Sequence, residues 1–368
     1  MKVNRLALIN FRNYKKQVFD FYDHINLIIG KNAQGKTNLI EALYLLSLSK
    51  SFRTRIHKEM IFFDENFTKI VGIITTKQRK KELQLVLSDD GKRAKIDGND
   101  ILKTSEFVGV LNVVVFTPDD LSLVKGSPSL RRKFMDIELS KINKYYLSSY
   151  NQYHKLLKER NLYLKQLQIK NKFTNDTYLD VLSEQMAALQ VKLIKERKVF
   201  LDKLNYYASS IYQQISNSKE FLTIEYACFY DENDEKLYDN ILRKYQKNVE
   251  KDIRYAKTSD GIHKDDFTMK LNQKDALLYA SQGQQRSIVL SLKIGLVSLI
   301  YEIINEYPVL LLDDVLSELD IHRQNQLLNL INEDIQTFIT STSLDHIKHE
   351  VLLKAKRFYI KEGGQIDG

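Results

Sequence analysis

The N-terminal part of the chain alternates short apolar runs with turn-like segments, which is the pattern of short strands. Residues 25–29 form one apolar run that ends at Gly30. Residues 37–48 then carry apolar side chains at helical spacing, so the pattern predicts a strand, a loop and a helix in succession. Other strands are predicted by the runs at 6–9, 69–75, 82–87 and 94–96, with a hairpin turn at Asp90-Gly91.

The middle of the chain has a different character. Residues 129–216 contain no glycine and no proline and are rich in Leu, Lys, Tyr and Gln. Apolar positions predict one long helix around 147–164 and another over 179–215. The segment 171–177 breaks the pattern between them, so we expect a helical hairpin or arm.

Strand-like segments return after residue 221. The pattern then predicts a helix over 284–305, a strand over 309–312, a helix over 321–333 and a strand over 337–340. Because strands alternate with helices at both ends, we expect an α/β domain formed by both chain ends and interrupted by an inserted, mainly helical domain, a short arm. The expected boundaries are 1–125 and 262–368 for the first domain and 126–261 for the insertion.

Composition narrows the class of protein. The 368 residues are 43% apolar and 28% charged, which is typical of globular rather than disordered or fibrous chains. The single cysteine, Cys228, excludes an internal disulfide framework and a cysteine-based zinc site, and it fits a reducing compartment. No apolar run reaches the roughly 20 residues that span a membrane, so we expect a cytoplasmic protein with no membrane partner. The net charge of +9 favours an anionic partner.

A phosphate-binding motif follows the predicted strand 25–29. Glycines let a backbone turn its amide groups toward phosphate oxygens, and the helix after the loop points its positive end at the same anion. We expect Lys36 to be a catalytic residue on the β- and γ-phosphates and Thr37 to ligate Mg²⁺. A chance match in an ordinary turn is the alternative. The segment fits G-x-x-x-x-G-K-[ST] in full, with nucleotide-binding residues Gly30, Lys31, Asn32, Ala33, Gln34, Gly35, Lys36 and Thr37.

Two acids follow the predicted strand 309–312. A carboxylate directly after a buried strand is costly unless a cation or a donor meets it. In a nucleotide site we expect Asp313 to hold Mg²⁺ and Asp314 to orient or activate the attacking water as a catalytic residue. The alternative is a helix N-cap or a pair of loop carboxylates.

A third segment precedes the predicted helix 284–305. Ser281 and Gly283 stand where that helix would begin, and a hydroxyl beside free amide groups makes an anion site. An ordinary N-cap turn is the alternative. The phosphate loop lies near the N-terminus and the other two segments near the C-terminus, so the two ends must fold together into one nucleotide-binding domain.

Together these segments resemble the ABC-type ATPases of the SMC class and, within them, the RecF family. The matching segments span nearly the whole chain in the order of that family. They are residues 10–14, 30–42, 49–53, 117–121, 124–128, 131–132, 160–161, 261–266, 281–286 and 312–320.

The resemblance implies an ATP-dependent homodimer that binds double-stranded DNA and single-strand/duplex junctions, with weak, DNA-dependent ATP hydrolysis. It implies work with RecR, and alongside RecO, to load RecA in recombinational repair, replication recovery and the SOS response, in the cytoplasm on the nucleoid. In ABC-type dimers a signature segment contacts the γ-phosphate bound by the other subunit, and a D-loop follows the acids. Those roles transfer to Ser281, Gly283 and Gln284 for the signature, and to Ser317, Glu318 and Asp320 for the D-loop.

Three positions depart from the wider ABC pattern. Asp314 stands where many members have Glu, which implies slow hydrolysis. No His directly follows 337–340, so Ser341 and Thr342 are both candidates for the switch position, and His346 is interpreted as a helix residue. The usual Q-loop glutamine is absent near 116–118.

Basic residues supply candidate contacts to DNA phosphates, an attraction that is independent of base sequence and weakens with salt. A solvated surface is the alternative for each cluster. The candidate DNA contacts are Lys50, Arg53, Arg55, Lys58 and the clusters at 77–81 and 92–95.

The phosphate loop by itself is also compatible with two other functions. These are a kinase for a small molecule and a transporter ATPase subunit.

Overall fold

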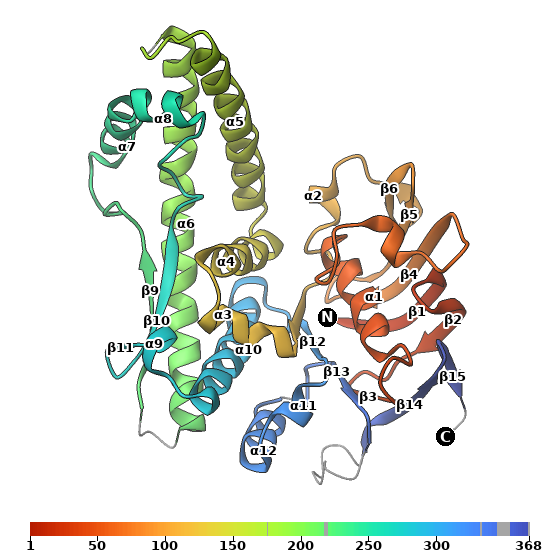
Figure 1. The fold of residues 1–368 in the computed structure, drawn as a ribbon. Helices are drawn as coiled ribbons and strands as arrows, with labels where there is room; N and C mark the ends of the chain where they lie inside the picture. Colours follow the sequence, from red (N-terminus) through yellow and green to blue (C-terminus); the bar gives the residue numbers. More distant parts are fainter. Residues whose placement is uncertain (175, 217–219, 332, 344–353, 367–368) are drawn as a thin grey trace. The chain divides into compact units, whose positions relative to one another are not determined.

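The computed structural model describes residues 1–174, 176–216, 220–331, 333–343 and 354–366. Within this part the chain forms two compact units, each assembled from separate segments (Figure 1). The first unit, here called the head, consists of Met1–Leu121, Tyr207–Phe221 and Ala280–Gly368. The second unit, here called the arm, consists of Ser122–Tyr206 and Leu222–Tyr279.

One sheet of the head is antiparallel and is built by N-terminal residues. The predicted hairpin is confirmed, because Ser88 and Gly91 pair across the turn that contains Asp90. In β4 every second residue is buried, which gives the sheet one core face and one outer face. The strand order is β2-β1-β4-β5-β6-β7, with bounds Lys2–Phe11 (β1), Tyr14–Asp20 (β2), Phe67–Thr75 (β4), Lys80–Ser88 (β5), Gly91–Ile96 (β6) and Asn99–Asp100 (β7).

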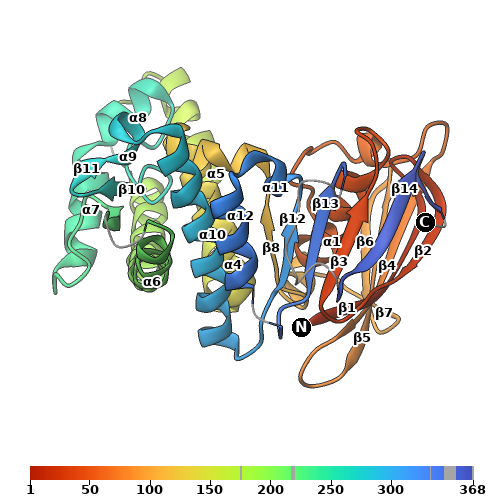
Figure 2. The same cartoon turned by 90° about the horizontal axis from the view of Figure 1, so that it is seen from below.

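The second sheet of the head joins the two ends of the chain (Figure 2). Its strand β3 lies between β13 and β14 and pairs in parallel with both. The expected α/β head formed by both chain ends is therefore confirmed. The strand order is β15-β14-β3-β13-β12-β8, with bounds Ile25–Ile29 (β3), Val113–Phe116 (β8), Val309–Leu312 (β12), Thr337–Ser341 (β13), Lys356–Lys361 (β14) and Gly364–Ile366 (β15).

The longest head helix, α10 (Gln282–Ile304), is a core helix. By length and composition alone it could cross a membrane, but 72% of its most apolar window is buried inside the fold. A Cβ at Gly295 would lie 2.8 Å from the backbone nitrogen of Ala208, so the glycine allows the chain near Ala208 to pack directly on α10. Other head helices are α1 (Lys36–Leu48), η1 (His57–Met60), α2 (Thr104–Phe107), η2 (Pro118–Leu121), α11 (Val315–Glu318) and α12 (Ile321–Leu330).

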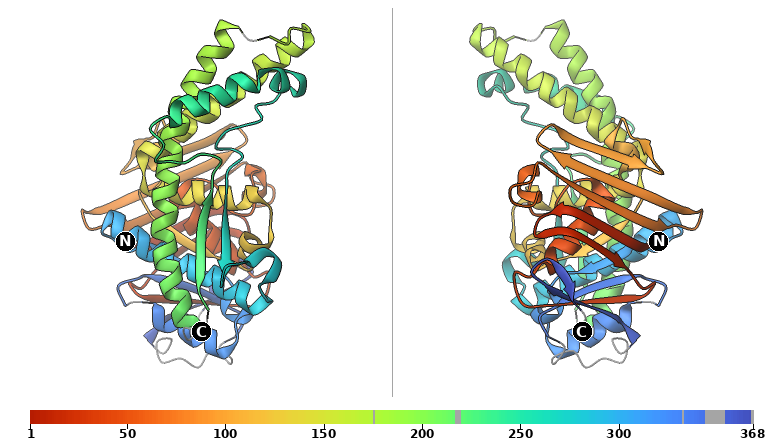
Figure 3. Two further views of the ribbon diagram at one scale, coloured as in Figure 1. Left: turned by 90° about the vertical axis from the view of Figure 1, so that its left-hand side faces the viewer. Right: turned by 90° about the vertical axis from the view of Figure 1, so that its right-hand side faces the viewer.

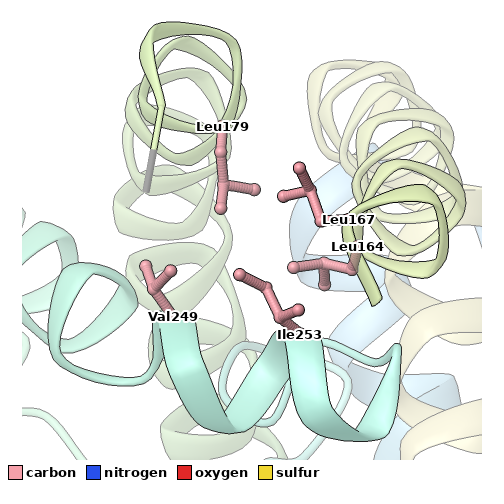
Figure 4. Close-up of a cluster of buried hydrophobic side chains, with 5 residues drawn as sticks. All are labelled: Leu164, Leu167, Leu179, Val249 and Ile253. Atoms are coloured by element: carbon pink, nitrogen blue, oxygen red, sulfur yellow. The ribbon is translucent and has the colours of Figure 1, made fainter. Parts of the chain in front are cut away.

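The arm contains the predicted helical hairpin. Helix α5 (Lys144–Ile169) ends shortly before the predicted break, and α6 (Thr177–Ile215) begins at its last residue. Figure 3 shows α6 as one long continuous helix. Near the hairpin end an apolar cluster joins α5, α6 and α8 through Leu164, Leu167, Leu179, Val249 and Ile253 (Figure 4). The remaining arm helices are α3 (Ser122–Lys125), α4 (Pro128–Ile142), α7 (Leu237–Lys247), α8 (Val249–Tyr255) and α9 (Ala276–Tyr279).

The arm also carries a small sheet, and the boundaries between head and arm differ from those expected from the sequence. Strand β10 (Asp266–Leu271) pairs antiparallel with β9 (Leu222–Ala227) and with β11 (Lys274–Asp275). Residues 262–279, expected in the first domain, therefore belong to the arm, and so do residues 122–125. Conversely, Tyr207–Phe221, which includes the last residues of α6, was expected in the insertion and belongs to the head, where the backbone of Tyr207 and Ala208 packs on Gly295 of α10.

Buried ion pairs hold the arm together. Arg160 and Asp252 are both fully buried and 2.7 Å apart, and Asn161 accepts the backbone amide of Thr258 at 2.7 Å. Arg197 pairs in the same way with Asp136 at 2.8 Å. Arg197 also pairs with the buried Asp265 at 3.3 Å. The family-like segments at 160–161 and 261–266 thus supply charged groups inside the arm.

Removing one charge from the buried pair should destabilise the arm strongly. We expect Asp252→Asn to lower the free energy of unfolding by about 3–5 kcal/mol, because Arg160 would stay buried without its counter-charge. Urea denaturation followed by circular dichroism measures the loss. Glu250→Gln is the matched control, because the Glu250–Arg254 pair on the same helix α8 is exposed; it should change stability by less than about 0.5 kcal/mol. Equal effects from both substitutions would contradict a role for burial.

Candidate nucleotide-binding site

The predicted phosphate loop connects β3 to the N-terminus of α1. Gly35 has φ of 121°, a left-handed conformation that favours glycine. A Cβ there would lie 2.8 Å from Asn13 Nδ2 and 3.0 Å from the Tyr14 hydroxyl. The second glycine of the motif is therefore required both for its backbone angle and for close packing.

The Lys36 side chain folds back over the loop. Its Nζ donates to the carbonyl oxygens of Gly30 at 2.6 Å and Lys31 at 3.0 Å. Burial lowers the pKa of the Lys36 ammonium, and the nearby carboxylates of Asp314 and Asp313 oppose that shift. The lysine thus lies between the loop and the acids, where a phosphate chain would need a cation.

Two turns from opposite ends of the chain support the outer side of the loop. Asn13 Nδ2 donates to the carbonyl of Gln34 at 2.9 Å, and the Tyr14 hydroxyl donates to the carbonyl of Gly35 at 3.0 Å. From the C-terminal side, the backbone amide of Gly363 donates to the same Gln34 carbonyl at 3.0 Å. In the sequence, residues 10–14 stood out only as part of the family resemblance, and no role was predicted for Asn13 or Tyr14.

The acid Asp313 directly contacts the phosphate loop. Its Oδ1 accepts the Thr37 hydroxyl at 3.1 Å, although the two residues are 276 positions apart. The same oxygen accepts the Thr340 hydroxyl at 2.9 Å. Burial raises the pKa of the Asp313 carboxyl, and the Thr340 and Thr37 hydroxyls oppose that rise. A carboxylate and a hydroxyl in contact are hard oxygen donors, so this pair fits Mg²⁺.

No cluster of three or more His, Cys, Asp or Glu residues that could hold a metal occurs among the described residues. A magnesium ion in a phosphate-loop site needs no such cluster, because phosphate oxygens supply further ligands.

Asp314 adopts an unusual backbone conformation at the start of α11. Its φ is 55°, and its backbone amide donates to the Thr340 hydroxyl at 2.8 Å. Its carboxylate makes no capping bond to the helix, and the Ser317 hydroxyl lies 2.7 Å from the Asp314 carbonyl oxygen and 3.1 Å from the Asp314 carboxylate. The first predicted D-loop residue is therefore in contact with the predicted catalytic acid.

The signature segment forms the N-terminus of α10. Ser281 and Gln284 make a reciprocal capping box, with the Ser281 hydroxyl 3.3 Å from the Gln284 amide. Ser281 is thus an N-cap residue, as the alternative interpretation held, and it is exposed at the N-terminus of α10. Arg286 of the same helix pairs with Glu318, a predicted D-loop residue, at 2.9 Å. Asp320, the last predicted D-loop residue, caps α12.

The two candidates for the switch position lie at the end of β13. Ser341 accepts the backbone amide of Gly30 with its carbonyl at 3.2 Å, and its hydroxyl donates to the carbonyl of Ser343 at 2.6 Å. Thr342 follows β13, and His346 lies outside the described residues. The side chain that touches both acids is Thr340, directly before the two candidates Ser341 and Thr342, and its role was not predicted from the sequence.

Comparisons with known proteins identify the family. The model of the RecF/RecN/SMC N-terminal domain matches residues 2–362. The DNA replication and repair protein RecF of Bacillus subtilis is 43% identical over 370 residues, covering 100% of both chains. The RecF protein of Staphylococcus carnosus is 43% identical over 367 residues, covering 99% of both. The chain belongs to the RecF family of DNA replication and repair proteins.

Solved structures agree with this membership. The chain matches a structure described as the recombination mediator protein RecF-ATP in the RecFOR pathway, with a TM-score of 0.91 and 34% identity, covering 99% of this chain and 97% of that one. An Smc head shares only the fold, with a TM-score of 0.55 and 16% identity. Membership in the RecF family excludes the small-molecule kinase and transporter alternatives.

The candidate DNA contacts of this RecF-family chain fall into two groups. Some are already engaged within the head, such as Arg53 with Glu41 at 3.3 Å and Arg79 with Asp97 at 3.1 Å. Lys92 donates a hydrogen bond to the carbonyl of Ser49, and Lys95 forms an ion pair with Asp100. Lys77 lies over the ring of Tyr301. The others have no ion pair or side-chain hydrogen bond among the described residues: Lys50, Arg55, Lys58, Lys80, Lys81 and Arg93.

The position of Lys36 predicts a specific defect. Lys36→Arg keeps the charge, but a planar, bulkier guanidinium cannot replace the point contact of an ammonium with phosphate. We expect ATP hydrolysis to fall by roughly 100-fold or more, with some ATP binding retained. Phosphate release and equilibrium ATP binding check this. Lys16→Arg is the control and should leave hydrolysis unchanged, because that side chain is exposed on β2, outside the phosphate loop. Hydrolysis at the normal rate in Lys36→Arg would remove Lys36 from the mechanism.

Proposed function

We propose that the chain binds Mg²⁺ and ATP in the head, dimerises through the bound nucleotide and holds duplex DNA during recombinational repair. The observation that carries the proposal is the 3.1 Å contact between Thr37 and Asp313. It brings the phosphate loop and the acidic strand from opposite ends of the chain into one site. A family relative solved as RecF-ATP supports ATP as the nucleotide.

The residues of the site have distinct proposed roles. Residues Gly30–Thr37 surround the phosphates with backbone amides, and Lys36 neutralises the β- and γ-phosphates. Thr37 and Asp313 would hold Mg²⁺, which when bound supplies positive charge that stabilises the phosphate oxygens. Asp314 orients the attacking water as a general base. Because Asp is shorter than Glu, hydrolysis should be slow.

A second copy of the chain completes the proposed site. Ser281, Gly283 and Gln284 sit at the exposed N-terminus of α10, where amide groups and the helix dipole attract an anion. We infer that this end contacts the γ-phosphate bound by the partner subunit. The Arg286–Glu318 pair would tie the signature to the D-loop residues Ser317, Glu318 and Asp320 at the same interface.

We propose that the anionic partner is double-stranded DNA, bound at junctions between single strands and duplex. The net charge of +9 supports this assignment, as do the six candidate contacts named above that have no ion pair or side-chain hydrogen bond within the described part of the chain. Contacts to phosphates would bind without base specificity and would weaken with salt. Further partners in the proposal are RecR and, functionally, RecO and RecA, in replication recovery and the SOS response. The place of action would be the cytoplasm, on the nucleoid.

The proposed role of Asp314 predicts a trapped complex. Asp314→Asn keeps the shape of the side chain and loses the carboxylate that orients water. ATP binding and ATP-dependent dimerisation should persist, while phosphate release falls by roughly 100-fold or more. Asp313→Asn is the comparison variant. Because Asp313 is the proposed Mg²⁺ ligand, ATP binding should also depend less on Mg²⁺ in this variant. If Asp314→Asn abolishes dimerisation, Asp314 is a structural residue or a metal ligand instead.

The composite site predicts a separation of ATP binding from dimerisation. Ser281 is exposed, so Ser281→Arg should fold normally. Its bulky cation should clash across the interface and oppose the positive end of α10. Each monomer should therefore bind ATP with near-normal affinity, form no dimer and bind duplex DNA more weakly. ATP affinity and sedimentation are measured on one sample.

Ser281→Ala is the graded control, because it removes the hydroxyl without adding bulk. It should weaken the ATP-dependent dimer and not abolish it. Two results would contradict the composite site: an ATP-dependent dimer in Ser281→Arg, or a matching loss of ATP affinity in the monomer.

A further inference from the structure

Strand β13 lies between the two strands that carry the site. It pairs in parallel with β3, which leads into the phosphate loop, and with β12, which leads into the acids. The register places Thr340 opposite Ile28 of β3, and Ile339 opposite Leu312 of β12. Thr340 therefore stands on the central strand, beside the point where β12 ends and Asp313 begins.

The Thr340 hydroxyl bonds both acids at once. It donates to Asp313 Oδ1 at 2.9 Å and accepts the backbone amide of Asp314 at 2.8 Å. The side chain is 1% exposed, so water does not compete for these bonds. An amide can only donate, so the single hydroxyl proton is left for the carboxylate. The direction of both bonds is thereby fixed.

We propose that Thr340 is the positioning residue that sets Asp313 for Mg²⁺ and holds Asp314 in its left-handed conformation. Metal ligands depend on such supporting hydrogen bonds, and their loss typically lowers metal affinity or activity by about 10–100-fold. A left-handed backbone is unfavourable for a residue other than glycine, and it persists where the surroundings hold it. The bond from the Asp314 amide to Thr340 is such a restraint. This inference rests on the proposed Mg²⁺ and ATP site.

The hydroxyl is the group to remove. Thr340→Val keeps the volume of the buried side chain and loses both hydrogen bonds. We expect the apparent affinity for Mg²⁺, measured as the Mg²⁺ concentration that supports half-maximal ATP binding, to weaken by about 10–100-fold. ATP binding in EDTA should be unchanged, because the phosphate loop is intact. The kcat for hydrolysis should also fall, because Asp314 loses its restraint.

Two further variants separate positioning from packing. Thr340→Ser restores the hydroxyl and should return the Mg²⁺ dependence to within about threefold of the unaltered protein. Thr337→Val is the matched control on the same strand: Thr337 is also fully buried, and its hydroxyl contacts only the carbonyl of Ile335 at 3.3 Å among the described residues. It should leave the Mg²⁺ dependence unchanged. Thr340→Ala provides the same measurement if the valine variant does not fold.

The outcomes distinguish this inference from the proposed function. Normal Mg²⁺ dependence in Thr340→Val or Thr340→Ala, while the unaltered protein binds Mg²⁺ and ATP and dimerises, overturns the positioning role alone. Equal losses with and without Mg²⁺, or equal losses in Thr340→Ser and Thr337→Val, assign Thr340 to packing and also overturn it. If ATP binding of the unaltered protein does not respond to Mg²⁺ at all, the result contradicts the proposed Mg²⁺ and ATP site itself, and with it the role of Thr340.

Discussion

The parallel pairing of β3 with β13 and β14 is the contact on which the rest of the head depends. Strand β3 comes from the N-terminal part of the chain, and its two neighbours come from the C-terminal part. The five residues of β3 are all buried, so burial of apolar surface and ladder hydrogen bonds both stabilise this pairing. Without it, Thr37 and Asp313 would be far apart.

This pairing also explains why the site depends on the whole chain. The phosphate loop takes hydrogen bonds from Asn13 on one side and Gly363 on the other, and the backbone of Gly30 bonds Ser341. Each contact joins segments that are distant in sequence, so none forms by local propensity alone. The entropy lost on closing such long loops is recovered only when the sheet forms, so the phosphate loop, the two acids and β13 should fold together.

Local sequence patterns predicted much of the fold and of the candidate site. The loop Gly30–Thr37, the buried strand 309–312 with its two acids, and the long arm helices each have a short-range signal in sequence. Thr340 has none, because a threonine in a strand is what β propensity alone would place there. The ion pair of Arg160 and Asp252 was equally hidden, because nothing local tells which acid a distant arginine will meet. The arm boundary shifted for the same reason, since β9 and β10 pair across a long intervening segment.

The central claim is that ATP and Mg²⁺ complete an interface between two copies of the chain. Sedimentation velocity of the unaltered protein tests it most directly, with Mg²⁺ and ATP, with ATP and EDTA, and with Mg²⁺ and ADP. We predict a dimer with Mg²⁺ and ATP and a monomer in the other two conditions. The same mass in all three conditions would contradict the account.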